Sequence, residues 1–401
     1  SAAGSAGARR FEGRLTADLL LRPNAAGAAI EPLALNATVT DPGLPALALQ
    51  LQGRADLGAD LLKWALQGKL DGERLVSAGQ ADLSAAVPAI RAQAQVDRID
   101  LNRWLAPGQP VASGPAAADT AIDLAGLRAV DGEFQLGAGA LAWRQYRVDA
   151  AALEATLNGG KLQVQRLAGR AWGGKVLASG SAEAGAQHIA IKLTADGVDV
   201  NALLRDVAGK DLLEGRGRVV ADLQTQGDSL GALRSQLAGS AAMQLRDGAV
   251  KGINLARSMR QAQAALSGRQ DALSQASATE KTDFTELSAS ARITGGVARS
   301  DDLALKSPFL RIGGAGQFDI GRGRIDYTAR ATVTGSPAGQ DGKALAALRG
   351  VTVPVELRGP FGAIEWKIQW SGVAAAALQN RLQDKIAEKL GGRPKPQDSD
   401  D

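Results

Sequence analysis

The sequence predicts a mainly β protein with a few helices, built as a long antiparallel meander. Three observations support this class. Short stretches in which apolar and polar residues alternate recur along the chain and end in Gly. Asp-Gly and Asn-Gly pairs, which supply the positive backbone angles of tight hairpins, occur at residues 71–72, 131–132, 158–159 and 247–248. Apolar residues at helical spacing are confined to a few places.

The alternation places apolar side chains on one face of each predicted strand. In residues 45–58, Leu47 shares a face with the residues two and four positions later, whereas Gln50 and Gln52 point the other way. Residues 13–21, 186–195 and 323–335 follow the same pattern. We expect the residues on the apolar face to point to the interior or to line a groove for lipid. They are Leu47, Leu49, Leu51, Ile189, Ile191, Leu193, Ile325, Ala329 and Val333. Because one step along a strand reverses the face, Gln50 and Lys192 should lie on the opposite, polar face.

Strand-to-helix corners are predicted at three similar segments. In each, a strand runs into Asp100, Asp199 or Asn254, whose side chain can accept a hydrogen bond from the free amides of a starting helix. Apolar residues follow and should pin the turn onto the sheet. We expect the helices that start there to cap, bend or cover the sheet at intervals.

Further helices are predicted toward the C-terminus. One lies within residues 227–239, with Asp228 or Ser229 as its cap, and another within residues 342–350. The longest spans residues 371–392 and is amphipathic. Its narrow apolar stripe consists of Leu378, Leu382, Ile386 and Leu390. We expect this helix to pack across the end of the sheet, near Trp366 and Trp370.

Composition shifts divide the chain into five parts. Residues 1–105 are predicted to be an N-terminal strand-rich groove segment, and residues 106–120 are a linker rich in Pro, Ala and Gly. A strand-repeat segment follows at 121–210, and a C-terminal region at 211–392 ends in the amphipathic helix. Residues 393–401 contain no apolar side chain and should be disordered.

Charge and cysteine content exclude several function classes. The 46 Lys and Arg residues are interspersed with 42 Asp and Glu residues, without a basic block, so a nucleic-acid partner is not expected. The absence of Cys removes disulfides and thiolate chemistry. No apolar run of about 18 residues occurs. The first residues have neither Met nor a signal-peptide core, so we expect the chain to be a trimmed piece that lacks a preceding membrane anchor.

Enzyme chemistry finds little support in the sequence. The chain contains one His, His188, and no nucleophile elbow, phosphate loop, dinucleotide fingerprint or paired-His zinc motif. We therefore predict a non-enzymatic protein without a metal site or a cofactor.

Several motifs resemble the AsmA family of bacterial envelope proteins. They are "TQGDSLGAL", "GSAAMQLRDGAVKGINL" and the closing "LRGPF" in the C-terminal half, and the "WGGK" turn in the repeated strand unit before it. The resemblance covers residues 121–392, and the first 105 residues resemble the family only in general texture.

This resemblance implies a protein held in the inner membrane by an N-terminal helix, with its body in the periplasm. It also implies the full fold class that we predict: a long curled antiparallel sheet forming an open hydrophobic groove, capped by short helices. Family members are implicated in carrying phospholipid between membranes and in outer-membrane assembly. The family offers no catalytic residues to transfer. The sequence departs from the family in lacking the N-terminal anchor.

Two functions remain open at this point. The first is a lipid-binding and transfer module that carries phospholipid acyl chains along the groove between the inner and outer membrane, supporting outer-membrane assembly. Exposing an acyl chain to water costs a free energy of roughly 0.8 kcal/mol per methylene. A continuous apolar surface along the sheet would remove most of this cost. The alternative is a non-catalytic envelope scaffold that docks other outer-membrane assembly proteins, with its apolar faces packed internally.

Overall fold

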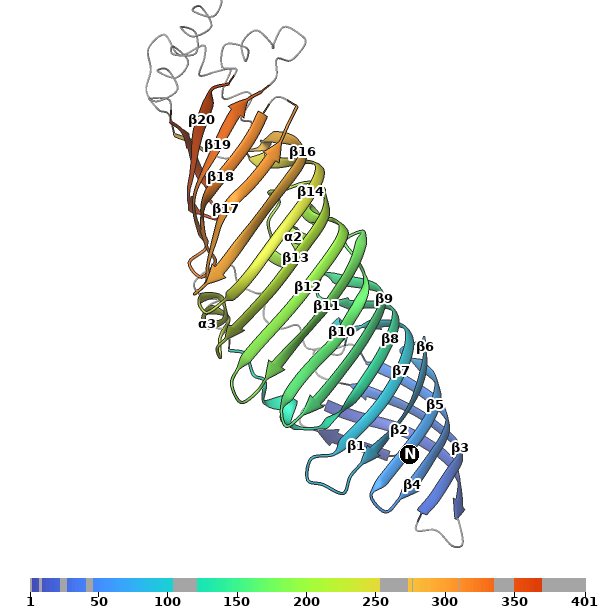
Figure 1. Ribbon diagram of the computed structural model, residues 1–401. Helices are drawn as coiled ribbons and strands as arrows, with labels where there is room; N and C mark the ends of the chain where they lie inside the picture. The colour runs from blue at the N-terminus through green and yellow to red at the C-terminus, as the bar shows by residue number, and fades with distance from the viewer. Residues whose placement is uncertain are drawn as a thin grey trace, which may run out of the picture. The chain divides into compact units, whose positions relative to one another are not determined.

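The computed structural model of the chain describes residues 2–6, 9–21, 27–40, 46–103, 121–252, 273–275, 277–308, 310–334 and 350–369. These residues confirm the predicted class, because they are mainly strands of one large open sheet with few helices (Figure 1). Backbone contacts divide the chain into two compact units. Unit 1 comprises Ser1–Lys210, Gly217–Ala242 and Arg292–Gly296, and unit 2 comprises Asp211–Arg216, Met243–Ala291 and Val297–Asp401.

Unit 1 is a series of neighbouring strands that follow one another in chain order (Figure 1). They are β1 (Ala2–Ala6), β2 (Arg9–Leu21), β3 (Gly27–Thr40), β4 (Leu47–Gly58), β5 (Leu61–Leu70), β6 (Glu73–Asp82), β7 (Ala89–Asp100), β8 (Asp131–Trp143), β9 (Tyr146–Asn158), β10 (Lys161–Ala171), β11 (Gly174–Glu183), β12 (His188–Asp199) and β13 (Arg216–Gln226). From β1 to β7 the neighbours pair in antiparallel hairpins. The meander that the sequence predicts is therefore present here.

The pairing of β7 with β8 departs from the antiparallel expectation. These two strands are parallel, with Ala94 opposite Leu136. Parallel neighbours need a crossover connection, which here lies between Asp100 and Asp131 in the chain. The alternation pattern cannot reveal this reversal, because a parallel strand and an antiparallel strand have the same period of two.

Two of the predicted Asp-Gly and Asn-Gly hairpins are present. Asp71 and Gly72 have φ values of 54° and 86° and connect β5 to β6. After Asn158, Gly159 and Gly160 have φ values of 58° and 81° and connect β9 to β10. Positive φ at both central residues is the backbone that a two-residue hairpin requires.

The other two predicted hairpins are wrong. Asp131 and Gly132 begin β8, because the chain arrives there from the crossover and not from a neighbouring strand. Asp247 and Gly248 lie inside strand β14 (Ala238–Gly252). There a Cβ on Gly248 would overlap the carbonyl oxygen of Glu214, so close backbone approach, not a turn, accounts for this Gly.

Unit 2 contains the C-terminal strands. They are most of β14 and β16 (Ser277–Thr294), together with β15 (Leu273–Gln275), β17 (Val297–Lys306), β18 (Leu310–Asp319), β19 (Arg324–Val333), β20 (Thr352–Pro360) and β21 (Glu365–Ile368). Strands β17 to β21 form successive antiparallel pairs. Strand β21 also pairs with β15, which brings the last strand of the unit beside one of its first.

Four helices are present among the described residues: the 3-10 helices η1 (Leu101–Arg103) and η2 (Ala125–Arg128), and the α-helices α2 (Val200–Ala208) and α3 (Leu230–Ser235). Ser229 caps α3 by accepting a hydrogen bond from the backbone N–H of Ala232, as the sequence predicts. In the described part of the chain, no helix has the length and apolar character needed to cross a membrane. The predicted linker 106–120, the corner at Asn254, the helices at 342–349 and 371–392, and the tail 393–401 lie outside the described residues.

Candidate functional site: an apolar face across β4 to β12

Backbone pairing defines one continuous face of unit 1, because directly paired residues of neighbouring strands point to the same side. One row of partners runs from β4 to β12 through Ala55, Trp64, Gly79, Ala92, Phe134, Ala155, Val164, Gly180 and Ile191. A second row runs through Leu57, Leu62, Ala81, Ile90, Gly132, Leu157, Leu162, Ala182 and Ile189. A third runs through Gly53, Leu66, Ser77, Ala94, Leu136, Leu153, Leu167, Ala178 and Leu193.

These three rows, with Leu47, Leu49 and Leu51 of β4, are called the apolar face below. The rows contain no charged residue, and Ser77 is their only polar side chain. Its hydroxyl oxygen lies 3.1 Å from the indole Nε1 of Trp64, which donates to it. The structure thus brings all six residues that we assigned in β4 and β12 onto one face of one sheet.

The opposite face of the same strands is polar. The row next to the first one runs through Asp56, Lys63, Gln80, Arg91, Glu133, Thr156, Gln163, Ser181 and Ala190. Its charges form ion pairs in water, such as Arg91 Nε to Glu133 Oε1 at 3.4 Å. Such exposed pairs contribute little to stability, about 0–1 kcal/mol each. The two faces therefore differ in chemistry across nearly the whole width of the unit.

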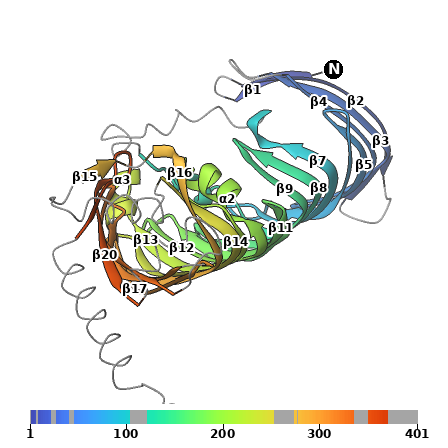
Figure 2. The same ribbon diagram turned by 90° about the horizontal axis from the view of Figure 1, so that it is seen from above.

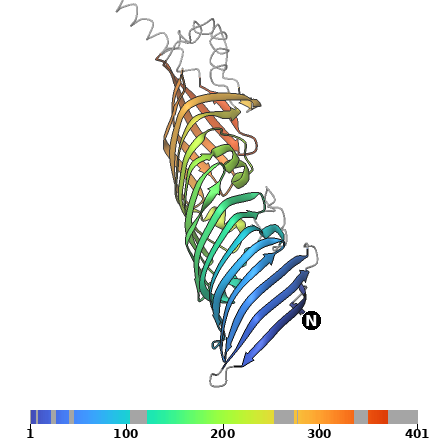
Figure 3. The same ribbon diagram turned by 90° about the vertical axis from the view of Figure 1, so that its right-hand side faces the viewer.

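Several large side chains of the apolar face are only partly buried, whereas Leu47 and Leu157 are 7% and 8% exposed. Leu62, Trp64 and Leu66 are half-buried, and Ile191 is 48% exposed. Small residues between larger ones are buried, as Ala138 is beside Leu136 and Val148. Figure 3 shows the strands of this region as a single layer. A contiguous apolar surface of this extent is uncommon on a protein that acts alone and marks a site for an apolar partner.

Helix α2 covers one corner of the apolar face, on the side of β11 to β13 that Figure 2 shows. Its Leu203 packs with Ala195 and Val198 of β12, and Val176 and Val219 lie against this cluster. Exposure along β12 falls from 48% at Ile191 to 0% at Ala195. The helix thus closes the face at one end of the strands and leaves the other end uncovered.

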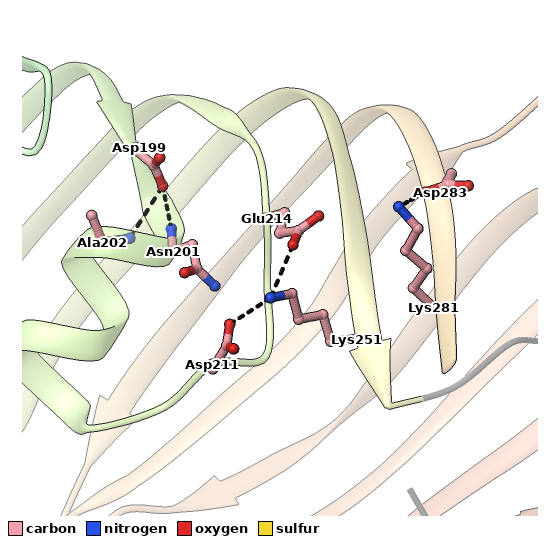
Figure 4. A network of polar contacts seen from close by, with 8 residues as sticks. All are labelled: Asp199, Asn201, Ala202, Asp211, Glu214, Lys251, Lys281 and Asp283. Carbon is pink, nitrogen blue, oxygen red and sulfur yellow. Dashed lines mark hydrogen bonds and ion pairs between the residues drawn. The ribbon is translucent and has the colours of Figure 1, made fainter. Parts of the chain in front are cut away.

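The cap of α2 is Asp199, the predicted corner residue. Its carboxylate accepts hydrogen bonds from the backbone N–H groups of Asn201 and Ala202, at 2.9 and 3.1 Å (Figure 4). This geometry satisfies two of the free amides of the helix N-terminus. Asp100 forms a weaker cap, because its carboxylate accepts one hydrogen bond, from the backbone N–H of Asn102 at 3.0 Å. The helix that follows it is the three-residue η1.

Polar contacts hold α2 to the turns beside it. The indole Nε1 of Trp172 donates to the carboxylate of Asp206 at 2.8 Å, and Gln145 Nε2 donates to the Asp206 carbonyl at 2.7 Å. Farther along, Asn102 Nδ2 donates to the Arg144 carbonyl, and Arg103 forms an ion pair with Asp71. The ends of the strands that carry these contacts are called the α2 rim, and their other ends are called the far rim.

In unit 2 the predicted apolar residues lie in a packed core. Ile325 and Val333 are 9% and 0% exposed, and Ala329 is half-buried. On the same face of β19, Ala331 pairs with Val353 of β20, and both of these residues are 0% exposed. These three residues are therefore on the same kind of alternating face, but other side chains cover that face.

Unit 2 contains a polar cluster around Lys251. Lys251 Nζ lies 2.8 Å from Asp211 and 2.9 Å from Glu214 (Figure 4). The hydrogen bonds to Asp211 and then to Glu214 raise the pKa of the Lys251 ammonium above its usual value. Among the described residues, no group of three or more Asp, Glu or His side chains is placed to hold a metal ion.

Sequence reasoning overlooked most of the residues that make up the apolar face. Trp64 and Phe134 lie in its first row, and Leu153 lies in its third, although none of these was assigned to a face. The signal was present in residues 61–70, where Leu62, Trp64 and Leu66 alternate with Lys63 and Gln67.

Comparisons with known proteins identify relatives of this sequence. The sequence profile of the AsmA family matches residues 92–303. The chain is 22% identical over 373 residues to Protein AsmA of Escherichia coli (strain K12), an alignment that covers 83% of this chain. It spans 59% of the length of that relative. No solved structure gives a significant match.

Proposed function

The chain belongs to the AsmA family of bacterial envelope proteins, and from this premise we propose that it binds phospholipid acyl chains on the apolar face of unit 1 and carries them between the inner and outer membrane. In this role it supports outer-membrane assembly from the periplasm, attached to the inner membrane in the full-length protein. The observation that carries the proposal is the uncharged face of β4 to β12, on which large apolar side chains such as Trp64 and Ile191 are partly exposed.

The chemistry of the face suits acyl chains. An alkyl chain of about sixteen carbons costs roughly 12 kcal/mol when it leaves a bilayer for water, at about 0.8 kcal/mol per methylene. A surface of Leu, Ile, Val and Ala side chains offers methyl and methylene groups without a directional polar contact. Such a surface removes most of that cost and lets the chain slide, because every position along it is similar.

The extent of the face also fits this role. Nine strands spaced about 4.8 Å apart make a strip of about 40 Å from β4 to β12. One leaflet of a bilayer has a hydrocarbon depth of about 15 Å. The strip is therefore long enough for an acyl chain to lie on it at more than one position.

The face carries no group that would recognise a phosphate. Its three rows are uncharged, and Lys63 and Arg91, which adjoin residues of these rows along β5 and β7, lie on the opposite face. The headgroup would therefore stay in water at a rim while the acyl chains lie on the strands. We expect little selectivity among phospholipid headgroups from the face itself.

A pair of matched substitutions tests the proposal. Ile191→Asp places a carboxylate on the apolar face, whereas Leu177→Asp places one on the polar face of the neighbouring strand. The two residues are exposed to similar extents, 48% and 51%. We expect Ile191→Asp to lower the amount of a photoactivatable phospholipid that crosslinks to the full chain by about tenfold, because a buried carboxylate is strongly disfavoured beside an alkyl chain.

Leu177→Asp should crosslink like the unsubstituted protein. Native mass spectrometry of the same samples measures the bound lipid directly. Equal lipid occupancy in both variants, or no lipid in the unsubstituted protein, would reject the proposed function and favour a scaffold that docks other envelope proteins.

A further inference from the structure

Two adjacent turns on the far rim of unit 1 expose large apolar side chains. Residues 59–60 connect β4 to β5, and residues 83–88 connect β6 to β7; with the strand ends that flank them, the two turns span residues 57–61 and 82–88. The exposed fractions are 38% for Leu57, 37% for Leu61, 55% for Leu83 and 39% for Val87. The turns are joined by a hydrogen bond from Leu83 N to the Asp60 carbonyl, at 2.7 Å. These four side chains are called the apolar tip.

The apolar tip continues the apolar face to the ends of the strands. Leu57 pairs with Leu62, which pairs with Ala81, so the second row of the face begins at the tip itself. No charged side chain interrupts this row between β4 and β12. An acyl chain on the face would therefore reach the tip without passing a polar residue of that row.

The α2 rim of the same unit is closed by polar contacts. Arg103 pairs with Asp71, Arg144 N donates to Asn102 Oδ1 at 2.5 Å, and Trp172 is bonded to Asp206. These contacts join the ends of β5 to β11, although Trp143 and Val207 at the same rim are 41% and 61% exposed. A lipid leaving the face there would have to displace them.

Farther along the far rim, residues 121–130 cover the ends of the strands. Ile122 N donates to the Asp228 carbonyl at 2.8 Å, beside β13. Arg128 lies against Gly160, and Asp131 Oδ1 accepts a hydrogen bond from Gly159 N at 2.7 Å. Within the described residues, this segment thus covers the rim near β9 to β13, whereas the side chains of the apolar tip are exposed to solvent.

We propose that the apolar tip contacts a lipid surface and is where acyl chains pass between a bilayer and the apolar face. This inference rests on the proposed function for the passage of lipid, but contact with a surface is separable from it. The charged residues of the two turns are Asp60 and Asp82, and Asp82 is held by the N–H and hydroxyl of Ser84, at 3.0 and 2.6 Å. Two carboxylates and no cation favour a zwitterionic surface over an anionic one.

The test uses the full chain and the double variant Leu83→Ser with Val87→Ser. Flotation with phosphatidylcholine vesicles measures contact with a lipid surface. Transfer of a fluorescent phosphatidylcholine to the protein measures loading, first from these vesicles and then from detergent micelles. Leu177→Ser is the matched control, because Leu177 is equally exposed but lies on the polar face.

We expect the double variant to float at least five times less than the unsubstituted protein and to load about ten times more slowly from vesicles. Loading from micelles should stay unchanged, because the apolar face is intact. Vesicles containing phosphatidylglycerol should capture less of the unsubstituted protein than vesicles of phosphatidylcholine alone.

Each contrary outcome has its own meaning. Flotation that is equal in the double variant and the unsubstituted protein, or equally reduced in Leu177→Ser, would overturn the apolar tip as a lipid contact. An unsubstituted protein that does not float would overturn it too and would leave a protein partner for the tip. If flotation depends on the tip but no variant takes up lipid from micelles, the surface contact stands and the proposed function fails.

Discussion

The apolar faces of units 1 and 2 arise from the same alternation but have different surroundings. In unit 1, Ile191 lies on a face that is uncovered around it and is 48% exposed. In unit 2, Ile312 lies on the equivalent face of β18 and is 7% exposed, between Leu305 and Ala331. The pairing of β21 with β15 brings the strands of unit 2 together, so that their apolar side chains pack against one another. Alternation thus defines which side chains share a face, and pairing at the ends of the strand series decides whether that face is a core or a surface.

The largest expected effect comes from truncating the same residue type in both units. Ile312→Ala should lower the free energy of unfolding by about 3 kcal/mol, because it leaves a cavity in a packed core. Ile191→Ala should cost less than about 1 kcal/mol, because half of that side chain is already in water. Denaturant titration of the full chain, followed by intrinsic fluorescence and circular dichroism, measures both values.

The comparison fails if the two variants lose similar stability. Such a result would mean that the face of unit 1 is covered in solution by another part of the chain. A cost above about 2 kcal/mol for Ile191→Ala would by itself lead to that conclusion.

A smaller loss of stability is expected at the part of unit 1 that helix α2 covers. Asp199→Ala removes both cap hydrogen bonds of α2 and should cost about 1 kcal/mol of local stability. Asp100→Ala removes one bond at η1 and should cost only a few tenths of that. Amide hydrogen exchange, read on a peptide that contains Asn201 and Ala202, should become about five times faster in Asp199→Ala.

Exchange over Ala195 and Val198 should rise with it, because α2 shields that part of β12. Unchanged exchange at β12 in Asp199→Ala would show that the packing of Leu203 holds α2 in place without its cap.

The smallest expected effect is on the stability of the protein at acidic pH. In unit 2, hydrogen bonds from the hydroxyl and then the N–H of Ser290 hold the pKa of Asp302 below its usual value. A carboxylate whose pKa is lowered by folding stabilises the protein above its unfolded pKa of about 3.9, and this contribution is lost as the pH falls through the folded value. The stability of Asp302→Asn should therefore fall less steeply below about pH 4.

In unit 1, hydrogen bonds from Ser84 lower the pKa of Asp82 in the same direction. They link residues two positions apart in one turn, whereas Asp302 and Ser290 connect β17 to β16. Asp82→Asn should therefore leave the acid transition nearly unchanged. Denaturant titrations at pH 3, 4 and 7 compare the two variants, and a larger change in Asp82→Asn would reverse this ranking.

The face pattern was predictable because it depends on local geometry. The alternation around Leu49 and around Ile191 needs no knowledge of neighbouring strands, since a strand sends successive side chains to opposite sides. The Asp71-Gly72 hairpin and the caps at Ser229 and Asp199 are local in the same sense. Each is decided by contacts within a few residues along the chain.

The two wrong hairpin predictions lie where a segment distant in the sequence determines the backbone conformation. Asp131-Gly132 has the composition of a hairpin, but the crossover from β7 delivers the chain there as the start of a parallel strand. Asp247-Gly248 also has the composition of a hairpin turn. There, however, the backbone of Glu214 approaches Gly248, and strand β14 continues through the pair. In neither place does the sequence near the pair contain the segment that determines its conformation.

By itself, the sequence determined that this protein is a β-sheet with one apolar and one polar side, because a period of two separates the faces wherever the chain is extended. Only the tertiary structure decided which apolar side chains meet water. Exposure is a property of what lies above a side chain, and α2 above Ala195 or β15 beside β21 reach their places through pairing between residues far apart in the sequence. The same physical reason explains why Ile191 and Ile312 look alike in the sequence and differ in the fold.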